Sequence, residues 1–131
     1  MSETIFKKLR MSVLSEDGGH SLSLCVASGF VDFVVEIPLT EEDFTVIKTD
    51  DERTSFLQAA LHHPFQLKET WLGIEEQRHY LDMILHSPKS DVESFLTEID
   101  HGSANGAISN MVRITCGKDQ GLLRRGKWFG R

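Results

Sequence analysis

The sequence predicts an α+β fold in which an antiparallel β-sheet packs against about four helices. Apolar residues alternate with polar ones through residues 5–37, which is the period of half-buried strands. After Pro38 they recur every three or four residues, which is the period of amphipathic helices. A late apolar stretch, residues 111–116, is predicted to rejoin the sheet. With 131 residues, the chain is long enough to bury a core and is expected to form one domain, residues 1–131.

Three consecutive strands form the predicted meander in the first third of the chain. Gly18 and Gly19 favour a hairpin turn, and Ser28-Gly29 forms a second short turn. Short turns between sequential strands predict antiparallel pairing, with one apolar face that needs a cover. The residues expected on that covered face are Ile5, Leu9, Met11 and Val13 in the first strand, Leu22, Leu24 and Val26 in the second, and Val31, Phe33, Val35 and Ile37 in the third.

The segment LTEEDFTVIKTDDERTSFLQAALHHPF, residues 39–65, predicts two helices with capping boxes at their N-termini. Thr40 and Asp43 form the first box, with a hydrophobic staple between Leu39 and Phe44, while Thr49 and Glu52 form the second. Acidic residues fill both first turns, where the helix dipole favours negative charge. Pro64 ends the second helix.

Two more helices and a tail complete the prediction. The third helix covers Ile74 to His86, with Ile74, Leu81, Ile84 and Leu85 on its buried face. The fourth begins at a capping box, Ser90 to Glu93, buries Val92, Phe95, Leu96 and Ile99, and ends at Gly102. Residues 117–131 form a Gly-rich basic tail.

Composition narrows the possible functions. The formal net charge is -6, which argues against direct binding to a phosphate backbone. The N-terminal residues are polar and lack the apolar segment of a signal peptide. No apolar run approaches the ~20 residues that cross a bilayer, so a cytoplasmic protein without membrane contact is expected. Cys25 and Cys116 are expected to be buried free thiols in a reducing compartment.

Two groups of histidines are candidate chemical sites. His62 and His63 precede Pro64, and we expect them to serve the helix C-terminus, with His62 on the polar side of the helix. Glu75, His79, Asp82 and His86 share one helical face at spacings that suit a divalent metal. We interpret that face as solvated, so neither a metal nor another cofactor is predicted.

The tail is a third candidate, because basic residues next to an aromatic ring can contact single-stranded nucleic acid. Its relevant residues are Arg124, Arg125, Lys127, Trp128 and Arg131. The favoured interpretation is a frayed or docked terminus in which Trp128 and Phe129 pack back on the domain.

The segment PLTEEDFTVIKTDDERTSFLQAALHHPFQ, entered from a strand meander, resembles small bacterial immunity proteins. These are the cytoplasmic antidotes of contact-dependent growth inhibition and related polymorphic toxin systems. The resemblance covers residues 31–66. It implies a small acidic α/β protein that binds one toxin domain, often a nuclease, and blocks its active site. Immunity families share no catalytic signature, so the resemblance transfers no functional residues.

Charge asymmetry agrees with that hypothesis. Residues 36–52 hold seven carboxylates against a single lysine, Lys48, and an acidic surface attracts a basic partner. The sequence therefore predicts a non-enzymatic protein-binding protein, without catalytic residues, that neutralises a cognate toxin. The alternatives are a small metal- or histidine-dependent enzyme and a nucleic-acid-associated accessory protein. The residues predicted to contact the partner are Glu41, Glu42, Asp43, Asp50, Asp51 and Glu52.

Overall fold

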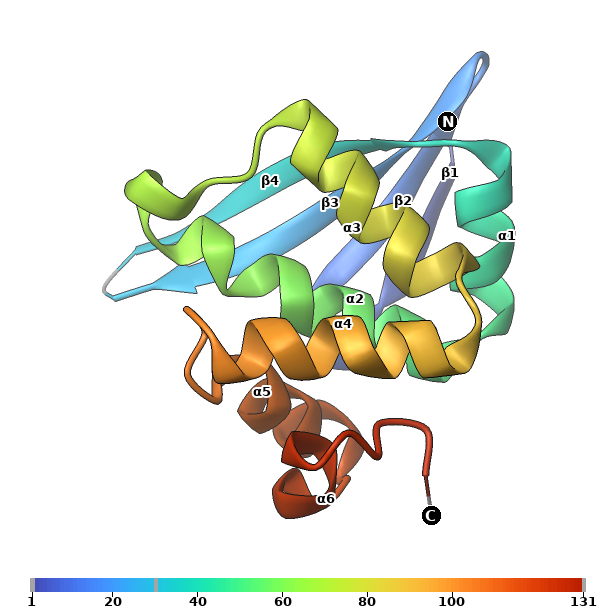
Figure 1. Cartoon of the computed structure of the whole chain (residues 1–131). Helices are drawn as coiled ribbons and strands as arrows, with labels where there is room; N and C mark the ends of the chain where they lie inside the picture. The colour runs from blue at the N-terminus through green and yellow to red at the C-terminus, as the bar shows by residue number, and fades with distance from the viewer. Residues whose placement is uncertain (1, 30, 131) are drawn as a thin grey trace.

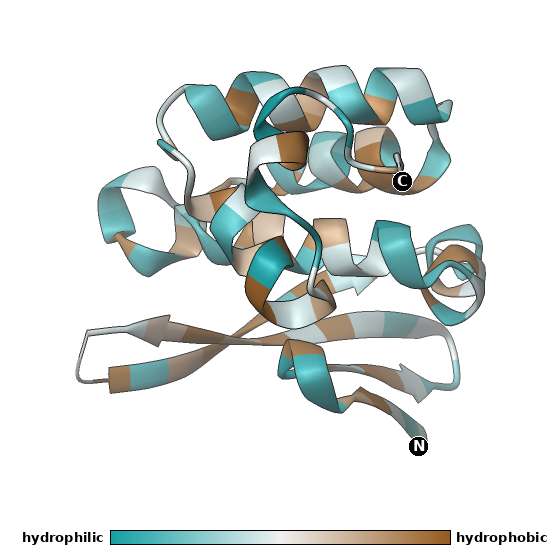
Figure 2. Ribbon diagram, turned by 90° about the horizontal axis from the view of Figure 1, so that it is seen from below, coloured by the Kyte–Doolittle hydropathy of each residue, from teal (hydrophilic) through white to brown (hydrophobic). Residues whose placement is uncertain are grey.

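A computed structural model describes residues 2–29 and 31–130 and confirms the α+β class. Four strands form one antiparallel sheet in the order β1-β2-β3-β4, namely β1 (Ser2–Phe6), β2 (Met11–Glu16), β3 (Gly19–Ser28) and β4 (Val31–Leu39). The α-helices are α1 (Glu41–Thr49), α2 (Asp51–His62), α3 (Ile74–His86), α4 (Lys89–His101), α5 (Ala107–Cys116) and α6 (Gln120–Arg124). The α-helices lie on one side of the sheet and leave its other face uncovered (Figures 1 and 2).

The first predicted strand is in fact two strands joined by a tight corner. A 3-10 turn, Lys7–Leu9, interrupts the alternation, and Arg10 adopts a left-handed conformation with φ 53°. Phe6 then pairs with Met11, so β1 folds back on β2. The polar pair Lys7-Lys8 breaks the apolar period and marks this corner, which gives the N-terminal meander four strands instead of the three expected.

The covered face of the sheet carries most of the predicted apolar residues. Met11, Val13, Leu22, Leu24, Val26, Val35 and Ile37 are all buried there. Two predictions were wrong: Ile5 is 67% exposed and Val31 is 65% exposed. Ile5 pairs with Ser12 and lies on the uncovered face. Across the corner, odd-numbered residues of β1 pair with even-numbered residues of β2, so Ile5 lies on the opposite face from Met11 and Val13.

Helix α1 begins at the predicted capping box, but α2 does not. Thr40 Oγ1 accepts from the Asp43 N–H, and the Asp43 carboxylate accepts from the Thr40 N–H. At the second junction Thr49 is still helical, so Asp50 caps α2 by accepting from the Arg53 N–H. Pro38 lies inside β4, one residue before its end, which is allowed because β4 is an edge strand.

Helix α3 has the predicted bounds, while the start of α4 differs. Ile74 was expected to be buried but is 66% exposed at the first turn of α3. Helix α4 begins directly after Pro88, without a side-chain cap, so Ser90 lies within the helix rather than at its cap. Gly102 ends α4, with its N–H bonded to the Glu98 carbonyl.

The predicted late strand is wrong, because residues 111–116 belong to helix α5. The β-branched residues of MVRITC resemble a strand when taken alone. Ile108 and Val112 are four residues apart and both buried, which places them on one face of the helix. Ile108 lies outside residues 111–116, so this helical spacing is not visible in that stretch alone. Left-handed glycines, Gly106 and Gly117, stand at the two ends of the helix.

The C-terminal tail is docked on the domain. Trp128 is fully buried, packs edge-on against Phe56 at 5.7 Å between ring centroids, and donates its indole N–H to Thr97 Oγ1 at 2.9 Å. Phe129 also packs against Phe56, as predicted. Arg131 lies outside the described residues. Within residues 2–29 and 31–130, each helix is too short or too polar to cross a membrane.

Replacing Trp128 should destabilise the whole domain. We expect Trp128→Ala to lower the free energy of unfolding by roughly 3–5 kcal/mol, because it leaves a large cavity beside Phe56. Trp71→Ala is the matched control, since Trp71 is 45% exposed. Urea unfolding followed by circular dichroism measures both variants, and an equal loss in the two would contradict a core role for Trp128.

Candidate functional site

The predicted partner-binding acids divide into buried, paired and free groups. Asp43 is fully buried, and its carboxylate accepts two hydrogen bonds from Arg78, at 2.7 and 2.8 Å, and one from His86 at 2.7 Å. A carboxylate in this position cannot contact a partner. It instead joins the start of α1 to the polar face of α3.

This hydrogen bonding controls the ionisation of Asp43. Burial by itself would raise the pKa of the Asp43 carboxyl, but the hydrogen bonds from Arg78, the Thr40 N–H and His86 outweigh it and lower the pKa from 3.8 to about 2. The carboxylate is therefore charged in the folded protein well below the pH at which it would protonate in the unfolded chain.

Three other acids of this group have cationic or histidine partners. Asp50 pairs with Arg53 at 3.2 Å, and Glu52 pairs with Lys118 at 2.9 Å. Glu41 binds His20, and that hydrogen bond lowers the pKa of Glu41. Within the described chain, the exposed acids Glu42 and Asp51 have no ion-pair partner. The carboxylates most available to a partner are therefore these two, followed by Glu41.

The polar face of α3 does not assemble the four residues suggested by the sequence. His79 packs edge-on against Phe95, and Glu75 is exposed. Asp82 and His86 instead meet Asp43, with ligand atoms of the three residues within 4.8 Å of one another. These are ligand types that a divalent metal accepts. The Arg78 guanidinium, however, contacts both Asp43 and Asp82, at 2.7 and 2.8 Å, and already supplies the positive charge.

The His62-His63 pair serves the fold, but not with the predicted orientation. His62 is buried rather than on the polar side, and its Nε2 accepts a hydrogen bond from the Ala27 N–H at 3.2 Å. Burial, and the charges of Arg10 and His63, lower the pKa of the His62 imidazole. A neutral ring can accept this hydrogen bond, so His62 ties the end of α2 to the end of β3.

One chain of hydrogen bonds was not foreseen from the sequence. Ser15 Oγ lies 2.7 Å from His20 Nδ1, and His20 Nε2 contacts the Glu41 carboxylate. Serine, histidine and a carboxylate in this order can activate a nucleophile. Here Glu41 is 72% exposed and His20 packs on the Phe44 ring at 4.6 Å. The chain thus fastens the start of α1 to the β2–β3 hairpin.

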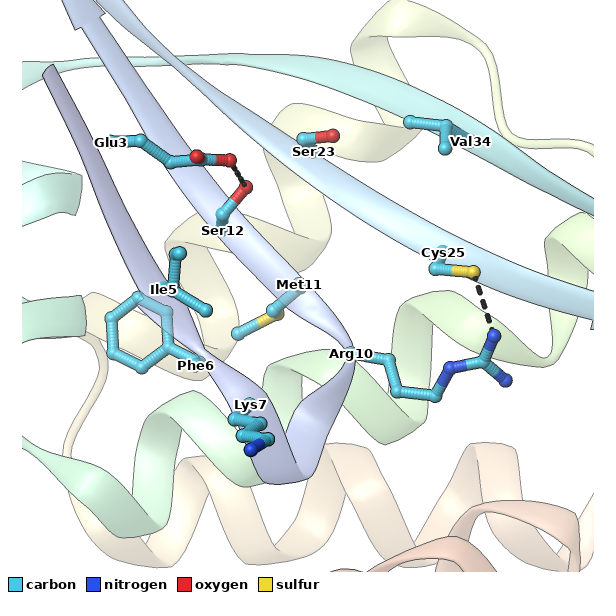
Figure 3. A pocket seen from close by; sticks show the side chains of 10 residues that line it. All are labelled: Glu3, Ile5, Phe6, Lys7, Arg10, Met11, Ser12, Ser23, Cys25 and Val34. Atoms are coloured by element: carbon cyan, nitrogen blue, oxygen red, sulfur yellow. Dashed lines mark hydrogen bonds between the residues drawn. The ribbon is translucent and has the colours of Figure 1, made fainter.

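The uncovered face of the sheet contains a hollow of about 360 Å³, shown in Figure 3. Small side chains from the two central strands, Ser12, Ser23 and Cys25, form its floor. Ile5 and Val34 stand on the outer strands and are 67% and 59% exposed. We call this the outer-face hollow. It is a shallow depression that is open to solvent.

Polar side chains around the outer-face hollow are held in place by hydrogen bonds. Ser12 Oγ donates to the Glu3 carboxylate at 3.0 Å, and Arg10 donates to Cys25 Sγ at 3.2 Å (Figure 3). Arg10 also donates to the Asp32 carboxylate at 3.0 Å. Acidic residues outnumber basic ones on this face: Glu3, Glu16, Asp32 and Glu36 stand against Arg10, which pairs with Asp32, and Lys7, which lines the hollow. The face therefore has small side chains at its centre, exposed Ile5 and Val34 on its outer strands, and an excess of carboxylates.

Sequence reasoning identified the face but not the hollow. Asp32, Glu36, Ser23 and Cys25 alternate with the buried residues, so their outward direction follows from the strand period. The hollow depends on β1, which places Ile5 beside Ser12. The prediction of a single strand over residues 5–13 did not include this pairing.

The cysteines are free thiols, as predicted, but neither is fully buried. Cys25 is partly exposed on the uncovered sheet face, and Cys116 is exposed at the end of α5.

Comparisons of the chain with protein-family models, curated proteins and solved structures found no match.

Acid titration should reveal the Asp43 interaction. Because the folded-state pKa of Asp43 lies below 3.8, the unfolded chain binds the proton first as the pH falls from about 5 to 2. This carboxylate should therefore contribute about 2 kcal/mol to the free energy of unfolding above pH 5 and lose most of that contribution as the pH falls to about 2. Urea unfolding across this range should be less pH-dependent for Asp43→Asn, while the exposed control Asp51→Asn keeps the wild-type dependence. Identical profiles for wild type and Asp43→Asn would contradict this assignment.

Proposed function

We propose that this protein is a non-enzymatic antidote of the immunity type, which binds one toxin domain through the uncovered face of its sheet. The observation that carries the proposal is the outer-face hollow: a rigid four-stranded sheet presents exposed Ile5 and Val34 around a floor of small side chains. Exposed apolar residues on a rigid scaffold, with polar groups at the margin, match the anatomy of protein interfaces.

The charge of this face suggests the chemistry of the partner. Glu3, Glu16, Asp32 and Glu36 would attract a basic surface and repel phosphate groups. A nuclease domain has a basic surface because it binds a phosphate backbone. Such a toxin would find both charge complementarity and an apolar anchor point here. A target inside the cell would place the antidote in the cytoplasm.

Acids outside the sheet would assist the encounter. Glu42 and Asp51 are exposed on α1 and α2 and have no ion-pair partner among the described residues, so their field acts on solvent and on approaching molecules. Charges at the rim of an interface mainly change the association rate. In this proposal, the free acids of the segment predicted from sequence increase the association rate, and the outer-face hollow holds the bound partner.

A charge placed in the outer-face hollow should abolish protection. The partner to test is any toxin domain that a neighbouring gene encodes, co-expressed with this protein in growing cells. Val34→Lys should raise the dissociation rate by about tenfold or more, because it inserts a cation at an apolar anchor facing a basic surface. Ile114→Lys is the matched control, since Ile114 is 62% exposed on α5. Unchanged protection by Val34→Lys would reject this face, and failure of the wild-type protein to bind the toxin would reject the proposed function.

Reversing two free acids should slow binding without weakening the fold. For Glu42→Lys with Asp51→Lys, we expect a lower association rate and a weaker dependence on salt, with the dissociation rate nearly unchanged. Each residue lies in a helix first turn, where losing the dipole interaction costs roughly 0.3–1 kcal/mol, so unfolding must be measured beside binding. An unchanged association rate and salt slope would show that these acids do not steer the partner.

A further inference from the structure

A second exposed apolar surface lies on the helix side of the sheet, where the irregular segment between α2 and α3 crosses the start of β4 (Figure 1). Trp71 stacks on Phe33 with ring centroids 5.6 Å apart and an angle of 20°, and Phe65 packs edge-on against Trp71. Trp71 is still 45% exposed, and Leu67 and Val31 are 62% and 65% exposed. We call Val31, Phe33, Leu67 and Trp71 the aromatic ledge.

The segment that carries the aromatic ledge contains two short 3-10 helices, Pro64–Gln66 and Lys68–Thr70, and hydrogen bonds hold it in place. Thr70 Oγ1 donates to the Pro64 carbonyl at 2.7 Å and contacts the Leu67 carbonyl at 3.1 Å. Gln66 is tied to the end of β3 in both directions: its amide donates to the Ala27 carbonyl, and its carbonyl accepts from Ser28 Oγ, each at 2.8 Å. A surface ordered before binding loses less conformational entropy when a partner docks.

Burial does not explain why these side chains are large and apolar. Phe65, at 1% exposed, already closes the core beneath this segment. Trp71 lies above it with one ring face on Phe33 and almost half of its surface in solvent. Tryptophan is the residue type most enriched among those that dominate binding energy in interfaces. Its position on an ordered surface segment therefore suggests recognition.

Charge around the aromatic ledge selects the kind of partner. The exposed charged side chains that flank Trp71 in the chain are Lys68 and Glu69 before it and Glu75 and Glu76 after it. Negative charge thus predominates in the segment that carries the exposed indole ring. Arginine and lysine bind favourably both to carboxylates and to the face of an indole, while a carboxylate-rich partner would be repelled.

We propose that the aromatic ledge docks a basic polypeptide segment, in which an apolar side chain packs against Trp71 and Leu67 while flanking arginines or lysines meet Glu69 and Glu75. This surface is distinct from the outer-face hollow. Phe33 points to the helix-covered side of β4, whereas its neighbour Val34 points to the uncovered side. Docking at the aromatic ledge therefore goes beyond the proposed function and can fail independently of it.

Two designed peptides test the charge rule. Each has two central leucines, flanked on both sides by two arginines in the first peptide and by two glutamates in the second. Calorimetric titration of the full chain should show saturable binding of the arginine peptide, weakened by salt, and no binding of the glutamate peptide. Trp71 fluorescence should change on binding, because Trp71 is exposed and Trp128 is buried. Equal binding of both peptides, or no saturable binding of either below millimolar concentration, would overturn the proposal.

Variants locate the binding. Trp71→Ala should weaken binding of the arginine peptide by about tenfold or more, while Ile114→Ala, which removes a still more exposed apolar side chain elsewhere, should leave it unchanged. Glu69→Gln with Glu75→Gln should weaken binding and flatten its salt dependence. Unchanged binding by Trp71→Ala would place the peptide elsewhere and overturn the inference.

Two further controls distinguish docking at the aromatic ledge from binding at the outer-face hollow and from self-association. Val34→Lys should bind the arginine peptide normally, so a loss of toxin protection in that variant with peptide binding intact would isolate the outer-face hollow. Sedimentation velocity over a range of concentrations tests whether the chain pairs with itself. A dimer that Trp71→Ala dissociates would identify a second copy as the occupant of the aromatic ledge and overturn the assignment to a basic partner.

Discussion

The placement of α1 against α3 depends on one buried carboxylate. Asp43 caps the first turn of α1 through the Thr40 N–H and accepts hydrogen bonds from Arg78 and His86 on α3. A buried charge is unfavourable unless it is fully paired, so these partners cannot separate without exposing or protonating the carboxylate. Local capping and long-range packing therefore share a single side chain. The start of α1 is fixed both to its own backbone and to a helix that begins about thirty residues later.

The sheet then divides the molecule into two surfaces with different origins. Its covered face supplies apolar residues to the core, and helices from the rest of the chain pack on it. Its other face carries serines, Cys25 and carboxylates, which are small or hydrated, but it also leaves Ile5 and Val34 exposed. The aromatic ledge arises differently. Hydrogen bonds to the end of β3 and within the segment between α2 and α3 hold it in place.

Burial and pairing leave only some of the acids in this chain available to other molecules. Of the six acids between Glu41 and Glu52, Asp43 is internal, Asp50 and Glu52 are paired with cations, and Glu41 binds His20. The charge count of a segment therefore overstates the field that a partner meets. Carboxylates on the uncovered sheet face add a second acidic region. A basic partner would meet negative charge from both the sheet and the helices α1 and α2.

The sequence by itself determined the α+β class, the β2–β3 hairpin, the α1 capping box and the bounds of α3, because each depends on local periodicity or on a side chain reaching its neighbouring backbone. It also predicted that Trp128 and Phe129 pack back on the domain. Only the tertiary structure decided that residues 111–116 are helical, since Ile108 and Val112 are buried together by packing that overrides β-branched propensity. The tertiary structure likewise decided which acids are free, because Arg78 and Lys118 reach their partners from distant parts of the chain. It also decided where the outer-face hollow lies, because residues from all four strands line it. Contacts between residues that are far apart in the chain produce no periodic pattern in the sequence.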